Sequence, residues 1–171
     1  MPYLARKITR VKWETGNEFA PNEIPADAVT SDLRTKSNTL SFWQLETPTN
    51  YIEISKIALA LVTEADRIDR LDLTWIDKNG FRSQGISVNP SDGRTPVKSL
   101  QSTHVDVAKL DLNRLSKIAS WIADGLSQNQ YRRFTKKEII QIIIEAIRQD
   151  LVSLDDLAPK VKDEIDKEFG M

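Results

Sequence analysis

The spacing of apolar residues changes along the chain from a two-residue period to a helical period. Over the first 110 residues, alternating apolar and polar positions predict strands over residues 4–13, 39–46, 71–76 and 103–108. Helical spacing predicts a helix over residues 51–65, and Pro25 suits the first turn of a shorter one. Strands and helices therefore mix in this part of the chain.

A hairpin is predicted in the middle of the chain. The dipeptide Asn79-Gly80 follows the strand at 71–76, and both of its residues tolerate a positive φ. We therefore expect a tight turn there, with a return strand over about 81–88 and a loop over residues 89–96.

The last 60 residues have the patterns of helices. Asp111 predicts the start of a helix that runs to about Asp124, with Gly125 at its end. Thr135 and Glu138 have the spacing of a capping box, which predicts a helix from 136 to about 149. A last helix is expected after Ser153, with an interruption near Pro159.

These elements predict an α+β fold. We expect a mainly antiparallel sheet of about five strands, two helices packed on it and a C-terminal helical subdomain. Residues 1–110 would form the sheet region and residues 111–171 the helical region, and the length of 171 residues predicts that both fold as one cooperative domain.

Composition excludes several chemistries. The chain has no Cys and one His, which excludes thiolate zinc sites, iron–sulfur clusters, disulfide scaffolds and cysteine nucleophiles. It has 24 Lys and Arg against 25 Asp and Glu, so no global basic field favours nucleic acid or an anionic membrane. No glycine-rich phosphate loop is present, and we expect no cofactor. The absence of Cys and of long apolar segments predicts a cytoplasmic protein without a membrane partner.

The single histidine is the obvious candidate for acid–base chemistry. His104 lies two residues before Asp106 on a predicted strand, which places both on one face but roughly 7 Å apart. A hydrolase or transferase site would combine them with Asp92 from the preceding loop. We expect no metal, because Arg67 and Arg70 interleave with the carboxylates of the acidic run over residues 64–72.

Two helices carry the interaction hypothesis. The apolar positions of the helix at 136, including Ile140 and Ile144, cover an arc of roughly 200°, wider than the ~100° that one core requires. Either a second helix of this chain or another protein covers the extra arc. Trp121 lies off the apolar stripe of its helix, between Arg114 and Lys117. An interface anchor would have this position, and so would a ring that packs under the following loop or takes a cation–π contact from one of the two cations. A non-enzymatic accessory protein that binds a protein partner or a second copy is our first hypothesis.

A basic segment supports an alternative function. Residues 131–137 combine cations and aromatic rings, which suit contact with a nucleic acid. The candidates are Tyr131, Arg132, Arg133, Lys136 and Lys137. A second basic cluster would extend this patch if the fold brings the two together. It comprises Arg34 and Lys36 with Arg6, Lys7, Arg10 and Lys12.

Overall fold

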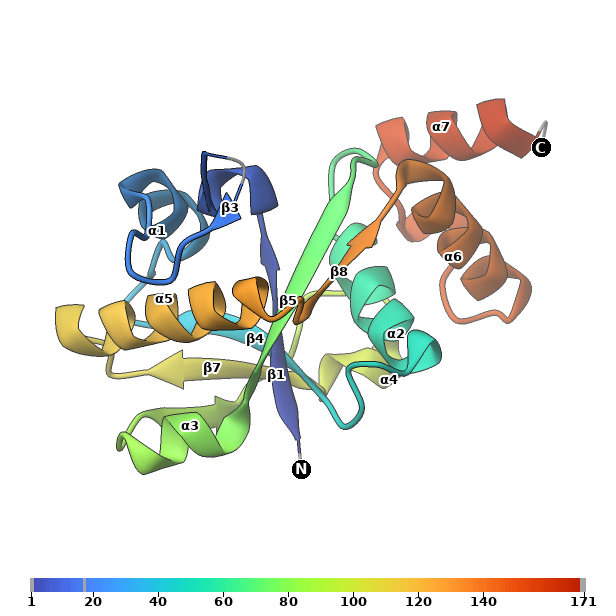
Figure 1. Cartoon of the computed structure of the whole chain (residues 1–171). Coiled ribbons are helices and arrows are strands. Elements are labelled where there is room, and N and C mark those ends of the chain that lie inside the picture. The colour runs from blue at the N-terminus through green and yellow to red at the C-terminus, as the bar shows by residue number, and fades with distance from the viewer. Residues whose placement is uncertain (1, 17, 170–171) are drawn as a thin grey trace.

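An antiparallel sheet runs through the centre of the molecule. The structure is a computed structural model that describes residues 2–16 and 18–169, and within these residues the sheet has six strands in the order β6-β7-β4-β1-β5-β8 (Figure 1). The strands are β1 (Tyr3–Ile8), β4 (Leu40–Leu45), β5 (Leu71–Asp77), β6 (Ser87–Pro90), β7 (His104–Ala108) and β8 (Tyr131–Phe134). The α+β class is thus confirmed, with one strand more than the expected five.

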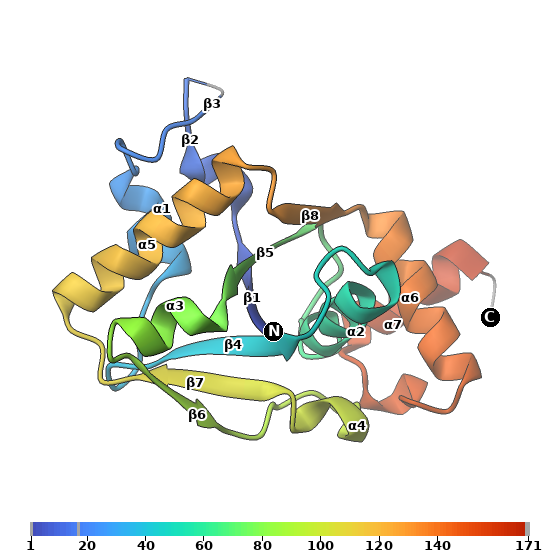
Figure 2. The same ribbon diagram turned by 60° about the horizontal axis from the view of Figure 1, so that its bottom comes forward.

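Helices cover both faces of the sheet, as Figure 2 shows. One face carries α1 (Ala26–Asp32), α3 (Lys78–Ser83) and α5 (Leu112–Ser127). The other carries α2 (Tyr51–Val62), α4 (Lys98–Gln101), α6 (Lys136–Arg148) and α7 (Pro159–Phe169). Alternation along the strands supplies both cores, because Leu4 and Phe42 face α5 whereas Ala5 and Trp43 face α2.

Four short elements complete the chain. They are the 3₁₀ turns η1 (Arg10–Trp13) and η2 (Leu154–Asp156) and the two-stranded pair β2 (Glu14–Thr15) and β3 (Glu18–Phe19). The strand predicted over residues 4–13 is therefore too long, because β1 ends at Ile8 and η1 follows. β2 and β3 lie in the segment that follows η1.

The capping box predicted at the start of the helix from residue 136, which is α6, is confirmed. The Thr135 hydroxyl accepts a hydrogen bond from the Glu138 N–H at 3.2 Å, and the Glu138 carboxylate accepts one from the Thr135 N–H at 2.8 Å. These two bonds satisfy N–H groups that would otherwise lack partners, so they fix where α6 begins.

The hairpin predicted at Asn79-Gly80 is wrong. Lys78–Ser83 form α3, which begins where the Asp77 carboxylate accepts a hydrogen bond from the Asn79 N–H at 2.8 Å. The return strand expected over 81–88 is also wrong, since β6 begins at Ser87 and pairs with β7 at the far edge of the sheet. A local N-cap therefore overrides the turn preference of Asn-Gly.

Two further boundaries differ in the C-terminal part. Gly125 does not end its helix, because α5 continues to Ser127 with Gly125 packed under Gln130. The basic segment 131–137 before α6 contains the strand β8, which no periodicity predicted and which pairs with β5. α5 and α6 consequently lie on opposite faces of the sheet. Among the described residues, no helix has the length and apolar content needed to cross a bilayer.

Candidate functional site

An apolar groove lies between α2 and α6. Its volume is about 510 Å³, and apolar side chains from both helices and the segment after α6 line it. The principal ones are Tyr51, Ile52, Leu59, Ile142, Ile144 and Leu151. Of five large hydrophobic side chains exposed in the described part of the chain, three line this groove, with 51%, 67% and 42% exposure for Tyr51, Ile52 and Leu151. Exposed apolar residues thus concentrate here.

Cations without carboxylate partners surround the groove. Lys56 of α2 and Arg148 of α6 line it, and neither forms a salt bridge within the described residues. Lys137 lies one helical turn before Gln141, which lines the groove. Lys137 is also exposed and forms no salt bridge within the described residues. Glu145 is the acidic residue of the rim, and its carboxylate accepts a hydrogen bond from Gln149 at 2.6 Å. The rim is therefore predominantly positive.

The predicted interaction residues divide between covered and groove-lining positions. Ile140 and Ile144 are 3% and 5% exposed, and Ile144 lines the groove. The wide apolar arc of α6 is covered mainly by this chain, because Val161 and Ile165 of α7 are fully buried in the same core. The part of that arc that faces α2 forms one wall of the groove.

On α5, Trp121 is half-buried instead of free. Its ring packs edge-on against Phe81 of α3 with the ring centroids 5.1 Å apart, and it also contacts Gly80. Arg114 is turned away to the Lys109 carbonyl, to which it donates at 2.8 Å, while Lys117 is exposed. Trp121 therefore packs between α5 and α3, where it also lines a small pocket with Gln130.

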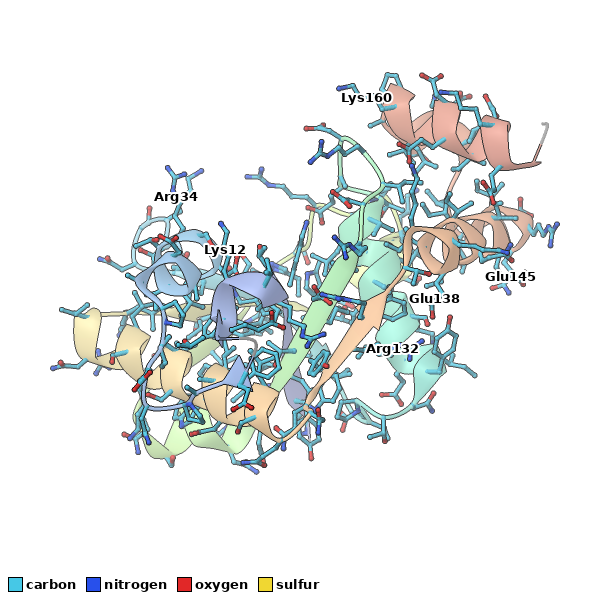
Figure 3. All side chains as sticks on the ribbon, turned by 45° about the horizontal axis from the view of Figure 1, so that its top comes forward. Lys12, Arg34, Arg132, Glu138, Glu145 and Lys160 are labelled. Atoms are coloured by element: carbon cyan, nitrogen blue, oxygen red, sulfur yellow. The ribbon has the colours of Figure 1, made fainter. Side chains whose placement is uncertain are left out.

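The basic segment 131–137 is largely occupied by internal ion pairs. Arg133 donates to both carboxylate oxygens of Asp72 at 2.7 and 3.0 Å, and this hydrogen bonding raises the pKa of Arg133. Arg132 donates to Glu138 at 2.6 Å, where β8 leads into α6 (Figure 3). Lys136 pairs with Glu164 of α7 at 3.0 Å.

Tyr131 has a structural environment as well. Its ring lies half-buried beneath the Arg10 guanidinium, 4.9 Å from the ring centroid, and near Phe19. Lys137 alone of the five candidates has no partner within the described residues. The short strand β8 was missed because four residues, two of them charged, do not establish a period.

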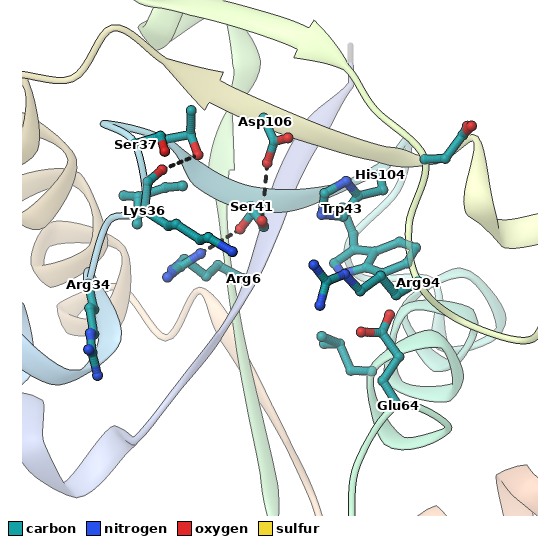
Figure 4. Close-up of a pocket in the computed structure, with 14 residues that line it drawn as sticks. Arg6, Arg34, Lys36, Ser37, Ser41, Trp43, Glu64, Arg94, His104 and Asp106 are labelled. Atoms are coloured by element: carbon teal, nitrogen blue, oxygen red, sulfur yellow. Dashed lines mark hydrogen bonds between the residues drawn. The ribbon is translucent and has the colours of Figure 1, made fainter.

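A second, polar cavity brings together all three acid–base candidates. It has a volume of about 590 Å³ and lies over β4 and β7, beside the end of α2 (Figure 4). His104, Asp106 and Asp92 all line it, together with Arg6, Arg34, Lys36 and Arg94. Half of the second basic cluster thus reaches the same cavity as the histidine, which no spacing in the sequence indicated.

His104 and Asp106 have different partners. His104 Nδ1 shares a hydrogen bond with the Ser91 hydroxyl at 2.8 Å, whereas Asp106 accepts one from the Ser41 hydroxyl at 3.1 Å. The imidazole also packs edge-on against Trp43 with the centroids 5.0 Å apart. Burial lowers the pKa of His104, partly opposed by the charge of Asp106, so the surroundings favour the neutral imidazole.

The Ser91–His104 pair has the distance of a nucleophile and its base but lacks the surroundings of one. Ser91 does not line the cavity. The Ser91 and Gly93 N–H groups donate to the carbonyls of His104 and Gln101 and are thus unavailable to an oxyanion. We therefore assign the pair a structural role.

Arg6 lines the cavity, and its guanidinium donates its hydrogen bonds to neutral backbone carbonyls. Its Nε and Nη2 donate to the Asp32 carbonyl at 2.9 and 2.6 Å, and Nη1 donates to the Ser41 carbonyl. The Asp32 carboxylate instead accepts hydrogen bonds from Thr9 and Trp13. Burial lowers the pKa of Arg6 to about 10, partly opposed by the charge of Asp32.

Metal binding has little support at either surface. Within residues 2–16 and 18–169, no three His, Asp or Glu side chains gather closely enough to hold an ion.

Comparison of the chain with protein-family models, with curated proteins and with solved structures gave no match. The groove and the cavity are therefore the features of the molecule that bear on its function.

Proposed function

We propose that the protein is a non-enzymatic accessory protein that binds an amphipathic helix of a partner protein in the groove between α2 and α6. The observation that supports this most is the concentration of exposed apolar side chains, because Tyr51, Ile52 and Leu151 all line one groove. Grooves between helices accept the apolar face of a third helix through anchors spaced three or four residues apart.

Charge complementarity defines the partner. Lys56 and Arg148 line the groove and Lys137 lies one helical turn before it, all without carboxylate partners in the described part of the chain. Acidic residues flanking the apolar anchors of a partner helix would supply those partners, which favours correct register and faster association. An acidic amphipathic helix is thus the occupant that we propose, and the cysteine-free composition favours the cytoplasm as the place of binding.

The nucleic-acid alternative receives less support from the same contacts. Arg132, Arg133 and Lys136 already pair with carboxylates of this chain, and a phosphate would have to displace them. Breaking those ion pairs costs free energy, whereas phosphate binding to an unpaired cation carries no such cost. We therefore favour protein binding.

A display library of helical peptides tests the proposal. The library keeps apolar residues at positions i, i+3, i+4 and i+7 and randomises the flanking positions among acidic, basic and neutral residues. We expect selection to enrich acidic flanks in peptides that bind the purified protein, because the rim is positive. Enrichment of basic or neutral flanks, or no peptide that requires the groove, would contradict the proposal.

Two matched substitutions show whether the groove is the binding surface. Ile52 and Val11 are both 67% exposed, but only Ile52 lines the groove. Ile52→Asp should weaken binding of a selected peptide by about tenfold or more, whereas Val11→Asp leaves it unchanged. Equal effects of the two variants would show that binding occurs elsewhere.

Light scattering separates a partner helix from a second copy of this chain. We expect a monomer at all concentrations and the same mass for Ile52→Asp. A dimer that dissociates in Ile52→Asp would show that a second copy covers the groove and would overturn the assignment to a partner helix.

A further inference from the structure

The polar cavity over β4 and β7 collects cations from separate parts of the chain. Arg6 comes from β1, Arg34 and Lys36 come from the connection between α1 and β4, and Arg94 follows β6. These segments are distant in sequence, and only the strand order of the sheet places them around one space. The cavity lies apart from the α2/α6 groove, and the two share no lining residue.

Most of this positive charge has no carboxylate bound to it. Arg34, Lys36 and Arg94 form no salt bridge among the described residues, and the three bonds of Arg6 go to backbone carbonyls. Figure 4 shows the Lys36 side chain extending toward Arg6 and Ser41, so two cations approach the same space. Like charges that converge without a carboxylate between them favour the entry of an anion.

The three carboxylates that line the cavity offset part of this charge, but none of them forms a salt bridge with its cations among the described residues. Asp106 accepts a hydrogen bond from Ser41, and Asp92 is exposed. Glu64 stands opposite Arg94 (Figure 4), and partial burial raises its pKa while the charge of Arg94 opposes that rise. Arg94 thus has a carboxylate nearby but no salt bridge to it among the described residues, so its guanidinium donors stay available to a ligand.

The remaining lining residues suit a small molecule. Ser37 and Thr39 contribute hydroxyl groups beside Lys36, and Trp43 with Leu61 forms an apolar wall. The volume of about 590 Å³ falls within the usual range of small-molecule sites, roughly 300–1,000 Å³.

We propose that this cavity binds a small phosphomonoester, with the phosphate held by Lys36, Arg94 and the positive field of Arg6. A phosphomonoester dianion takes several charge-assisted hydrogen bonds, which the lysine and arginine donors provide. The rest of the ligand lies against Trp43 and Leu61. The site is independent of protein binding at the groove.

The single histidine makes the test direct. His104 lines the cavity, so its two ring-carbon protons give the only imidazole signals in the proton NMR spectrum. We expect these signals to shift saturably when ribose 5-phosphate or adenosine 5′-monophosphate is added at constant pH and ionic strength. Inorganic phosphate should bind more weakly, because it makes no contact with the apolar wall.

Matched variants assign the effect to the cavity. Lys36→Gln and Arg94→Gln should each weaken binding about tenfold, because each loses one charge-assisted contact with the phosphate. Lys12→Gln should leave binding unchanged, since Lys12 is exposed and lies outside the cavity. All three side chains lack hydrogen-bond partners in the described residues, so the substitutions leave the fold intact.

Three results would overturn the proposal. One is a linear, unsaturated shift across the millimolar range for every phosphate ester. A second is equal weakening by Lys12→Gln, which would mean diffuse electrostatic attraction. The third is a preference for a different ligand class. Succinate that binds more tightly than either ester would show this, and so would a single-stranded oligonucleotide that binds more tightly than either ester and whose affinity also depends on the distant Lys160.

Discussion

The helices α5 and α6 cover opposite faces of the same sheet, and their surroundings are closed to different degrees. α5 buries Ile118, Ile122 and Leu126 against the sheet. Its single aromatic residue, Trp121, packs against α3. α6 is covered by α7 on one side, but its side toward α2 leaves the groove open. The tryptophan of α5 is therefore packed against another element of this chain, whereas the groove beside α6 is not filled by one.

The difference follows from short elements rather than from the helices themselves. α3 closes α5 because the Asp77 cap turns residues after β5 into a helix that places Phe81 under Trp121. No comparable element crosses the open side of the groove in the described part of the chain. A third helix supplied by another protein would do for α6 what α3 does for α5.

Removing the ring that closes α5 should have the largest effect. Phe81 is fully buried between Phe42 and Trp121. Phe81→Ala should lower the free energy of unfolding by about 3–5 kcal/mol, because it leaves a cavity where two rings met. Ile52→Ala, on the open groove, should change it by no more than about 0.5 kcal/mol. Urea denaturation measures both, and comparable losses would refute the contrast between a closed and an open helix.

The caps of the two helices provide a smaller comparison. Thr135 and Glu138 satisfy each other's backbone N–H groups on α6, whereas Asp111 accepts a single backbone bond, from Arg114 at 2.8 Å, on α5. Thr135→Ala should destabilise by about 1–2 kcal/mol and Asp111→Ala by about 0.5–1 kcal/mol. Equilibrium denaturation of the two variants in the same buffer decides it. A larger cost for Asp111→Ala would mean that the reciprocal bonds add nothing.

Local signals in the sequence predicted the elements that local interactions determine. The start of α6 was predictable because the residues of its capping box are three positions apart. Asn79-Gly80 misled for the same reason, since a strong local turn signal competed with an equally local cap at Asp77. Where two short-range signals conflict, packing decides between them, and here Phe81 is buried by the helix.

The two surfaces were only partly predictable. Ile144 and Lys137 belong to the predicted interaction and basic sets, and both lie at the groove, but their convergence with Ile52 depends on how α2 packs against α6. The cavity joins Arg6, Lys36 and His104 through the pairing of β4 with β1 and β7. Strand order is a long-range property that no residue spacing encodes, so the sequence named several of these residues without placing them together.

A buried hydroxyl beside the groove predicts a gain of stability. The Ser55 Oγ of α2 is buried without a hydrogen-bond partner in the described residues, whereas Ser120 Oγ of α5 donates to the Ser116 carbonyl at 3.2 Å. Ser55→Ala should therefore raise the free energy of unfolding by roughly 0.5–1 kcal/mol, by removing an unsatisfied group and favouring the helix. Ser120→Ala should gain less. Thermal and urea unfolding of both variants give the measurement, and a loss of stability in Ser55→Ala would mean that the hydroxyl is bonded in solution.

The smallest effect is a pH dependence specific to the start of α6. Hydrogen bonding from the Thr135 backbone N–H, with the Thr135 hydroxyl and Arg132 adding to it, lowers the pKa of Glu138. A carboxyl whose pKa is lower in the folded state stabilises the fold above its unfolded pKa, and that contribution disappears as the pH falls through the folded value. Wild-type protein should therefore lose more stability between about pH 5 and pH 3 than Glu138→Gln, which keeps a hydrogen-bonding side chain but does not titrate. Denaturation at several pH values gives the two slopes, and if they coincide, the charge of Glu138 contributes nothing to the cap that the Thr135 bonds do not already supply.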